Sequence, residues 1–283
     1  MSLPEQLTIL ACQIDVPVTR TAADRDQHLR RLCERVSAEL KDKRVDLVVL
    51  PELCSIDYSR EAFERLDVLS ETIRGASFQH WRKISSAHRC HVAFSFARRD
   101  DDGQYRITLA VVGPDGELVG YYDKIYLAQF GASMEKEFFT PGAEFFRFSI
   151  NGFRIAPIIC ADIRFPEVCR TLAIDHGVDV ILHSSAYSRD PSFHSWHSFV
   201  HTRALENQVF FVSLNRAGAD YGRSLFCPPW IDDSLEPTDF SERDQQFKTL
   251  TIDRSELVRV RELYPFLKDR REQIEQSGKG FPD

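Results

Sequence analysis

Two short stretches, VDLVVL at residues 45–50 and VDVILH at residues 178–183, echo each other in this chain of 283 residues. Each is an apolar run of strand length, and each follows an expected strand and helix in the same order. The preceding strands are expected at residues 7–13 and 153–160, and the helices at residues 24–40 and 166–176. The repetition predicts two pseudo-equivalent strand–helix–strand units that feed one core. A chance match of two apolar strands is the alternative.

The segments between and after these units continue the alternation of strands and helices. Helices are expected at residues 77–88 and 193–207, and strands at residues 90–97, 106–112, 118–122, 209–215 and 247–252. The turn Pro114-Asp115-Gly116 predicts a hairpin between two of the strands. Asp253 has the position of an N-cap for a short helix that begins at Arg254. The pattern therefore indicates the α/β class.

The composition is that of one soluble globular domain. With 43% hydrophobic and 28% charged residues, the chain has the ordinary balance of such domains. We find no linker or low-complexity tract that would divide it. We therefore expect a single domain over residues 1–265. Residues 266–283 carry a Gln/Ser/Gly/Lys tail, and we expect them to form a C-terminal arm.

Charge and cysteine usage exclude several classes of protein. The net charge of -7 comes without a clustered basic stripe, which argues against nucleic-acid partners. The N-terminal hexapeptide lacks the features of a secretory signal, and no apolar run approaches the roughly 20 residues that span a bilayer. The seven cysteines show no repeated short spacing, which favours free thiols in a reducing compartment. We expect a cytoplasmic protein with no membrane partner.

Three motifs place a reactive side chain at the end of an expected strand. They are LPEL at residues 50–53, YYDK at residues 121–124 and IICADIRFPE at residues 158–167. Taken alone, Glu52 and Lys124 are ordinary solvated charges, and a cysteine after an apolar run is usually an inert core residue. Cys160 is distinguished by its place before an expected helix, because a helix N-terminus gives a thiol more thiolate character.

Together the three residues make a nucleophilic mechanism possible. A thiol with an ordinary pKa of about 8.5 needs a base to take its proton or a cation to stabilise its thiolate. Glu52 can be that base, because burial raises the proton affinity of a carboxylate. Lys124 can stabilise the oxyanion that forms when the Cys160 thiolate attacks a carbonyl, together with the backbone N–H that follows the nucleophile.

With these motifs in order, the chain resembles the nitrilase, or carbon–nitrogen hydrolase, superfamily over nearly its whole length. LVVLPEL is similar to the glutamate motif of that family, YYDKIYL to its lysine motif and IICADIRFPE to its cysteine motif. Further marks are Glu135 ahead of FTPG at residues 139–142, and RALEN at residues 203–207 ahead of NRAG at residues 215–218. Several ordered motifs are far more specific than any one of them.

The resemblance implies a four-layer α-β-β-α sandwich with two pseudo-symmetric halves, and it implies roles for named residues. Glu52 is then the general base and later the acid that protonates the leaving amine. Cys160 forms a thioester acyl-enzyme, while Lys124 and the N–H of Ala161 hold the oxyanion. Glu135 matches a second glutamate beside the lysine and the substrate. Members of the family commonly form homo-oligomers, dimers or larger, and we expect neither a metal nor a cofactor.

Departures from the family bear on the substrate. Ala161-Asp162 stands where true nitrilases usually carry Trp-Glu, which favours amide over nitrile hydrolysis. The loop of residues 54–58 lacks a common glycine, and Ser184 replaces a common proline in the stretch of residues 183–187. Both loops are expected to line the pocket.

Candidates for binding the substrate include the backbone of Ala161 and four aromatic side chains that could equally be core packing. Those aromatic candidates for the pocket wall are Tyr58, Phe130, Tyr187 and Trp196. Arg164 could reach a substrate carboxylate, although a local charge contact with Glu167 is the reading we favour.

The sequence predicts an amidase that acts on a small linear amide, with several alternatives. An N-carbamoyl amide hydrolase would release carbon dioxide as well as ammonia, and a nitrilase would consume a nitrile. An inactive binding or scaffold member would be expected to lack a triad residue, and all three are present. His194, His197 and His201 share one helix face, but without an HExxH motif a polar face or substrate contacts are favoured over a metal site. No G-x-S-x-G elbow or early glycine-rich turn supports a serine hydrolase or a Rossmann enzyme.

Overall fold

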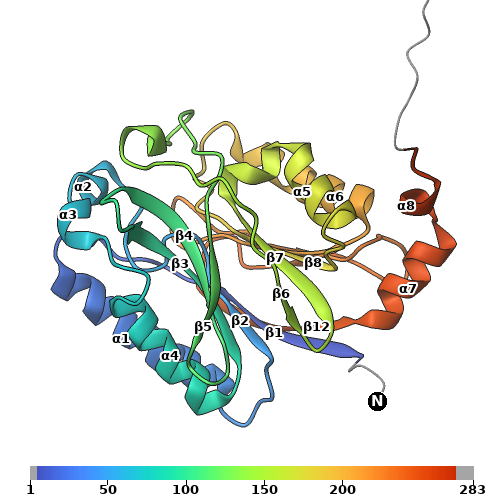
Figure 1. The fold of residues 1–283 in the computed structure, drawn as a ribbon, viewed down its shortest axis with the longest axis horizontal. Coiled ribbons are helices and arrows are strands. Elements are labelled where there is room, and N and C mark those ends of the chain that lie inside the picture. The colour runs from blue at the N-terminus through green and yellow to red at the C-terminus, as the bar shows by residue number, and fades with distance from the viewer. Residues whose placement is uncertain (1–4, 272–283) are drawn as a thin grey trace, which may run out of the picture.

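The structure is a computed structural model, and it describes residues 5–271. Most of the expected C-terminal arm, residues 272–283, and the first four residues of the N-terminal hexapeptide lie outside the described residues. Two six-stranded sheets pack face to face with helices on both outer sides, which confirms the predicted four-layer arrangement (Figure 1). The helices α1 and α4 cover one sheet, and α5 and α6 cover the other (Figure 1).

The strands of the first sheet lie in the order β12-β1-β2-β3-β4-β5. Their bounds are Gln6–Gln13 for β1, Leu47–Val49 for β2, His91–Arg99 for β3, Tyr105–Val112 for β4, Leu118–Asp123 for β5 and Gln246–Asp253 for β12. The strands of the second sheet lie in the order β11-β10-β9-β8-β7-β6. Their bounds are Phe148–Ile150 for β6, Phe153–Ile159 for β7, Val180–Ser184 for β8, Phe210–Leu214 for β9, Leu225–Cys227 for β10 and Thr238–Asp239 for β11.

The two halves are equivalent in topology, as the repeated hexapeptide predicts. In the first sheet β1, β2 and β3 are parallel, with β12 antiparallel to β1 and β4 antiparallel to β3. In the second sheet β7, β8 and β9 are parallel, with β6 antiparallel to β7 and β10 antiparallel to β9. The echoing segments therefore contain β2 and β8, the middle parallel strand of each sheet.

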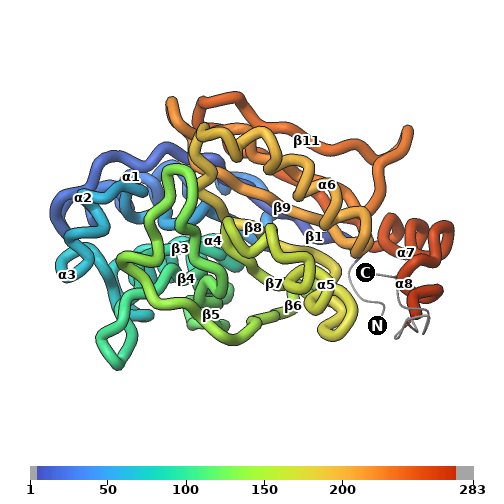
Figure 2. The backbone as a smooth tube through the Cα atoms, turned by 90° about the horizontal axis from the view of Figure 1, so that it is seen from above, coloured from blue at the N-terminus to red at the C-terminus, as the bar shows by residue number. Residues whose placement is uncertain are grey.

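The helices lie close to their expected positions. Their bounds are Ala22–Leu40 for α1, Arg60–Phe63 for α2, Leu66–Leu69 for α3, Ala76–His88 for α4, Pro166–Ile174 for α5, Trp196–Asn207 for α6, Arg254–Leu263 for α7 and Phe266–Asp269 for α8. Three 3₁₀ turns complete the set: η1 at Glu135–Glu137, η2 at Cys160–Arg164 and η3 at Phe193–Ser195. The helices α7 and α8 lie beyond one end of the sheets (Figure 2).

The parallel strands of both sheets are largely buried on both faces, which fits the apolar residues at their consecutive positions. In β1, Leu7 and Ile9 belong to the large core that includes both sheets, whereas Leu10 and Cys12 pack against α1 and α4. Successive side chains of a strand point to opposite faces, so one run fills two cores. Among the described residues, no helix is long and apolar enough to cross a membrane.

Local hydrogen bonds explain where several elements begin. Thr21 caps α1 through a capping box with Asp24, so the helix begins two residues before the expected position. The Asp253 side chain accepts the Ser255 N–H at the start of α7, which confirms the predicted cap. The expected helix over residues 193–207 is wrong in one respect, since η3 is a separate turn ahead of α6. Strands β6, β10 and β11 and helices α2, α3 and α8 were not predicted, and α8 lies at the start of the expected arm.

Candidate active site

The loops at the ends of three strands bring together four residues that the sequence singles out. Glu52 follows β2, Lys124 follows β5 and Cys160 follows β7, while Glu135 begins η1. The first sheet thus supplies the carboxylate and the lysine, and the second supplies the thiol. All four residues are buried, with exposed fractions of 8% for Cys160 and 0% for the other three.

Lys124 is held between two carboxylates. Its Nζ donates to Glu52 Oε1 over 2.7 Å and to Glu135 Oε1 over 2.6 Å. Burial acts to lower the pKa of Lys124, but Glu135 and Glu52 outweigh it and raise the pKa well above its usual value. The lysine is therefore a permanent cation at neutral pH, fixed in position where a developing negative charge needs stabilisation.

Glu52 combines a fixed oxygen with a free one. Oε1 accepts from Lys124, whereas Oε2 is buried and has no hydrogen-bond partner within residues 5–271. Burial raises the pKa of Glu52 to about 7, against the pull of Lys124 and with the support of Glu135. Such a pKa suits a group that must take up and release a proton near neutrality.

The Cys160 thiol is a neutral group in the resting protein. Burial and the negative charge of Glu52 raise its pKa well above the usual value, while Lys124 and the Ala186 backbone N–H act to lower it. The expected gain in thiolate character from a helix N-terminus is wrong, because Cys160 opens the short 3₁₀ turn η2 and α5 begins only at Pro166. A base is consequently needed to activate this thiol.

The backbone of Cys160 has φ of +43°, in the left-handed region that a residue with a side chain rarely adopts. The neighbouring Asp162 stabilises this turn. Its carboxylate accepts the N–H groups of Ile159 and Tyr126, each over 2.8 Å, and the Tyr122 hydroxyl over 2.7 Å. Asp162 therefore joins the nucleophile turn to the lysine strand and does not line the cavity beside Cys160.

A second support holds the Glu52 turn. The buried Arg216 donates to the carbonyls of Glu52, Leu53 and Ile56 over 3.1, 2.6 and 2.7 Å. Arg216 belongs to the NRAG motif at residues 215–218, but no role was predicted for it from the sequence. Its basic charge after the apolar strand β9 was the available signal, since a buried arginine needs acceptors.

The segment that follows β8 connects the glutamate turn to the cysteine turn. Ser184 donates its hydroxyl to the Leu50 carbonyl over 2.7 Å, a bond that the proline common in the family cannot make. The Ser185 carbonyl accepts the Glu52 N–H over 3.4 Å. One residue further on, Ala186 presents its N–H to the Cys160 thiol. Consecutive residues of one segment thus contact both turns.

A small cavity opens beside the thiol. The residues that line it are Ala128, Phe130, Ser133, Cys160, Ala161, Arg164, Ala186, Tyr187, Ser188, Asp190 and Ser192. Four of the expected substrate-binding residues, Phe130, Ala161, Arg164 and Tyr187, are among them. The stretch of residues 183–187 contributes to the lining as expected, whereas the loop of residues 54–58 does not.

The remaining two expected binding residues lie behind the cavity. Tyr58 donates its hydroxyl to Glu135 Oε1 over 2.7 Å, so it reaches the site through that carboxylate. Trp196 is fully buried and stacks on Tyr187, with ring centroids 5.1 Å apart. Both side chains therefore support residues at the site without lining the cavity.

Arg164 corrects one expectation. No ion pair joins it to Glu167 or to any other carboxylate in the described part of the chain. Its Nη2 donates to Ser192 Oγ over 3.2 Å, and its Nε is buried without a partner. The guanidinium lies over the rings of Phe130 and Tyr187, 4.7 and 5.6 Å from their centroids. The favoured charge contact with Glu167 is thus wrong, and a cation faces the cavity.

Two of the three histidines at helical spacing are neighbours, since the ring centroids of His197 and His201 lie 6.4 Å apart. His197 Nε2 lies 2.7 Å from the Arg223 carbonyl, and His194 belongs to η3, outside α6. Over residues 5–271, no group of three or more His, Cys, Asp or Glu side chains is arranged to hold a metal ion.

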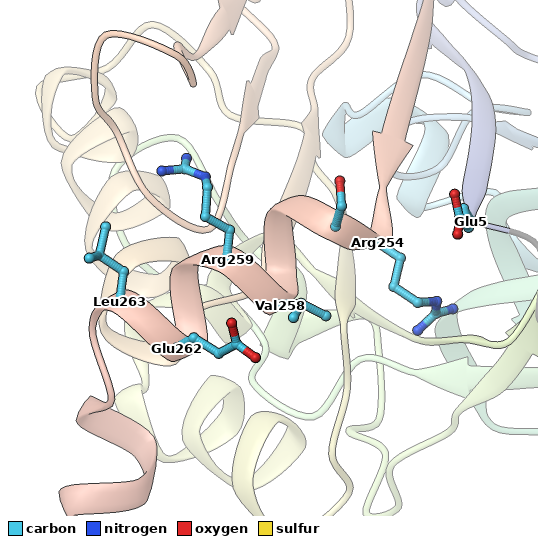
Figure 3. A pocket seen from close by; sticks show the side chains of 7 residues that line it. Glu5, Arg254, Val258, Arg259, Glu262 and Leu263 are labelled. Carbon is cyan, nitrogen blue, oxygen red and sulfur yellow. The ribbon is translucent and has the colours of Figure 1, made fainter.

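A more open groove lies elsewhere, along α7 (Figure 3). The residues that line it are Glu5, Arg254, Ser255, Val258, Arg259, Glu262 and Leu263. It shares no residue with the Cys160 cavity. Arg259 pairs with Asp232 over 3.1 Å, and none of the lining residues is a cysteine or a histidine. The chemistry of the molecule is therefore concentrated at Cys160.

Comparisons with known proteins agree with this geometry. Residues 8–262 match the profile of the carbon-nitrogen hydrolase family. A 2-oxoglutaramate amidase of Bacillus subtilis (strain 168) is 31% identical over 243 residues, which cover 83% of this chain and 89% of the relative. A protein named nitrilase from Pyrococcus abyssi (strain GE5 / Orsay) is 30% identical over 247 residues, which cover 85% of this chain and 90% of the relative.

A solved structure supports the fold in the same way. Saccharomyces cerevisiae Nit3, described as a member of branch 10 of the nitrilase superfamily, superposes with a TM-score of 0.82 at 20% identity. The likeness covers 95% of this chain and 98% of that one.

Proposed function

The chain belongs to the carbon–nitrogen hydrolase family, within the nitrilase superfamily, and from this we propose that it is an amidase for a small linear amide. The observation that carries the proposal is the buried Glu52–Lys124–Glu135 cluster beside the Cys160 cavity, with Glu52 Oε2 free. A free carboxylate oxygen with a pKa of about 7 can accept a proton from a neutral thiol.

The proposed reaction has two halves. Glu52 takes the Cys160 proton, and the thiolate attacks the amide carbonyl to form a carbon–sulfur bond. The oxyanion of the tetrahedral intermediate is held by Lys124 and by the N–H of Ala161. Glu52 returns its proton to the leaving nitrogen, the carbon–nitrogen bond breaks, and ammonia leaves behind a thioester on Cys160.

Water completes the cycle by the same route. Glu52 removes a proton from water, and the hydroxide attacks the thioester carbonyl while Lys124 and Ala161 again hold the oxyanion. The carbon–sulfur bond then breaks, Cys160 recovers its proton, and a carboxylic acid leaves. Each proton is passed by Glu52, so no metal or cofactor is required for the balance of the reaction.

The far end of the substrate is proposed to be anionic. Arg164 faces the cavity and forms no ion pair in the described chain, and the unpartnered hydroxyl of Tyr187 lies on the same wall. Asp190, the carboxylate on the same lining, accepts the N–H groups of Ala132 and Ser192. A carboxylate pairs readily with a guanidinium. 2-Oxoglutaramate, named for the Bacillus subtilis relative, carries its carboxylate at the end opposite the amide. A short amide with a terminal carboxylate is thus the substrate class we favour.

A substrate screen with intact-mass readout tests the proposal. It compares a short ω-amide acid, the neutral amide of the same length, the matching nitrile and an N-carbamoyl amino acid, with ammonia and carbon dioxide measured separately. We expect ammonia from the ω-amide acid and a transient acyl adduct on Cys160. Carbon dioxide release would favour the N-carbamoyl alternative. Consumption of the nitrile alone would favour the nitrilase alternative, a name that the Pyrococcus abyssi relative carries.

Cys160→Ala is the decisive variant. It removes the sulfur and keeps a residue of similar size in the buried turn, so we expect a folded and inactive protein. If Cys160→Ala released ammonia from the true substrate at the parent rate, the amidase mechanism proposed here would be wrong. Cys169→Ala is the matched control, because Cys169 is also buried but lies on α5 and is absent from the cavity lining.

A further inference from the structure

A chain of buried hydrogen bonds ends on the nucleophile. His183, in β8, has its Nε2 2.9 Å from the Cys160 carbonyl and its Nδ1 2.8 Å from Ser213 Oγ. Trp196 donates its indole N–H to the same Ser213 Oγ over 3.1 Å. His183, Ser213 and Trp196 are each fully buried. The contacts therefore run from α6, through β9 and β8, to the turn that begins at Cys160.

The donors and acceptors of this chain are fixed by elimination. The Cys160 carbonyl can only accept, so Nε2 of His183 must carry a hydrogen. Burial lowers the pKa of His183 to about 3, so the ring is neutral at physiological pH and Nδ1 must accept. Ser213 then donates its single hydroxyl hydrogen to Nδ1, and its lone pair receives the Trp196 N–H. Ser185 Oγ, 3.0 Å from Nε2, is a second acceptor for the same N–H.

The carbonyl that His183 contacts belongs to the peptide group between Cys160 and Ala161. That group is planar, so the direction of its C=O fixes the opposite direction of the Ala161 N–H. An accepted hydrogen bond also polarises the peptide and makes its N–H a stronger donor. Because Cys160 has φ of +43°, rarely populated by such a residue, an external contact is needed to hold this orientation.

We propose that His183 is a positioning residue that aims the Ala161 N–H at the oxyanion formed from the substrate. The proposal rests on the proposed function, in which that N–H holds the oxyanion. His183 is not among the residues that line the Cys160 cavity, and its contact with the site is the hydrogen bond to the Cys160 carbonyl. His183 acts through the peptide group between Cys160 and Ala161. Ser213 and Trp196 act on His183 by fixing which of its ring nitrogens carries the hydrogen.

Two substitutions separate the hydrogen bond from the bulk of the ring. His183→Gln keeps an amide N–H that reaches about as far as Nε2, whereas His183→Leu removes the donor. His91→Leu is the control, because His91 also contacts a backbone carbonyl, that of Asp46. His91 is the first residue of β3, whereas the Glu52 turn follows the last residue of the parallel strand β2. The assays use the substrate identified in the screen, with thermal unfolding measured for each variant.

The expected result is a loss of kcat without a change in KM. A misdirected oxyanion donor costs up to about 10²-fold in kcat, by analogy with removal of one such donor. We expect that loss in His183→Leu, at least partial recovery in His183→Gln, and parent activity in His91→Leu. An aldehyde analogue of the substrate, which forms a tetrahedral adduct with the thiolate, should bind His183→Leu more weakly by a similar factor. Alkylation of Cys160 by iodoacetamide involves no carbonyl oxyanion and should change less than about twofold.

Two results overturn the inference. One is parent kcat in a folded His183→Leu protein. The other is a folded His183→Gln protein as slow as His183→Leu, because the N–H would then not be the operative feature. Cys160→Ala is assayed in parallel to separate the two proposals. If it stays active, the proposed function fails and this inference fails with it; if it is inactive while His183→Leu is fully active, only this inference fails.

Discussion

Glu135 holds Lys124 through an oxygen 2.6 Å from Nζ, and it is itself immobilised by two further donors. The Tyr58 hydroxyl contacts the same oxygen, and the Ala128 N–H donates to the other over 2.8 Å. Glu52 has one oxygen bonded to Lys124 and one oxygen free. Two carboxylates around one lysine are thus prepared for different tasks, Glu135 to hold the cation and Glu52 to move a proton.

The pH dependence of kcat/KM should report the ionisation of Glu52. Its pKa is raised to about 7, and only the deprotonated form can accept the Cys160 proton. Activity should therefore fall as the pH drops through about 7. Steady-state assays between pH 5 and pH 9 in buffers of constant ionic strength provide the measurement. An acid limb near the ordinary glutamate pKa of about 4.3 would contradict this assignment.

Substitution of Glu135 should move that acid limb. The negative charge of Glu135 helps to raise the pKa of Glu52, so Glu135→Gln should lower this pKa and shift the limb to lower pH. A lower pKa also makes Glu52 a weaker base, so the plateau rate should fall. Glu137→Gln, which removes an exposed carboxylate paired with Arg60, is the control. An unshifted profile in Glu135→Gln would count against electrostatic coupling between the two carboxylates.

Removal of Lys124 should make stability depend more strongly on pH. Lys124→Met leaves buried carboxylates without their cation, which should cost about 3–5 kcal/mol of unfolding free energy. Lys124 lowers the pKa of Glu52, so in the variant that pKa rises further above its unfolded value. Stability from a raised pKa is present at low pH and is lost as the pH rises through the folded value. Urea unfolding should therefore show a larger deficit at pH 8 than at pH 5; an equal deficit at both would refute the argument.

Replacement of Arg164 should change substrate preference. Arg164→Met removes the cation that faces the cavity but keeps apolar contact with Phe130 and Tyr187. We expect KM for a carboxylate-bearing amide to rise by about 10-fold or more, the scale of one charge-assisted hydrogen bond, with little change for the neutral amide of equal length. Arg170→Met, on α5 and paired with Glu206, is the control. A parallel rise for both amides would indicate a structural role only.

Arg216 offers a test of how rigidly the base is held. Its three bonds to carbonyls of the Glu52 turn come from the other half of the molecule. Arg216→Lys keeps the charge but loses the fork geometry, so some carbonyls lose their donor. We expect a loss of about 1–3 kcal/mol in stability and a lower kcat. Chemical denaturation and steady-state assays measure the two quantities. A parent unfolding free energy together with a parent kcat would show that the Glu52 turn does not depend on Arg216.

Local patterns in the sequence predicted most of the strands and helices, whereas the four layers and the place of Glu135 beside Lys124 came from the family resemblance. Parallel strands buried on both faces are continuous apolar runs, and Glu52 and Cys160 follow two such runs, β2 and β7. Strands β10 and β11 were not predicted, because they have only three and two residues. Such short segments show no hydrophobic alternation of their own, and neighbouring strands hold them in place. Their existence depends on pairing with neighbours, since β10 pairs with β9 and β11 pairs with β10.

Contacts between residues far apart in the chain could not be predicted from the sequence. The surroundings of Arg164 depend on the direction that η2 gives its side chain. The charge contact with Glu167, which was predicted from the spacing of the two residues, is therefore wrong. His183 was visible only as a polar residue in an apolar strand, with Ser213 30 positions away. The catalytic and binding roles, the oligomeric state and the cytoplasmic location remain predictions.

The pairing of β1 with β12 has a consequence for the synthesis of this protein. The register joins Gln6 to Asp253 and Gln13 to Gln246, so the ribosome must release residues through 253 before the first sheet closes. Until then one edge of β1 presents unpaired N–H and C=O groups, a template for aggregation. The first sheet is therefore completed only late in translation.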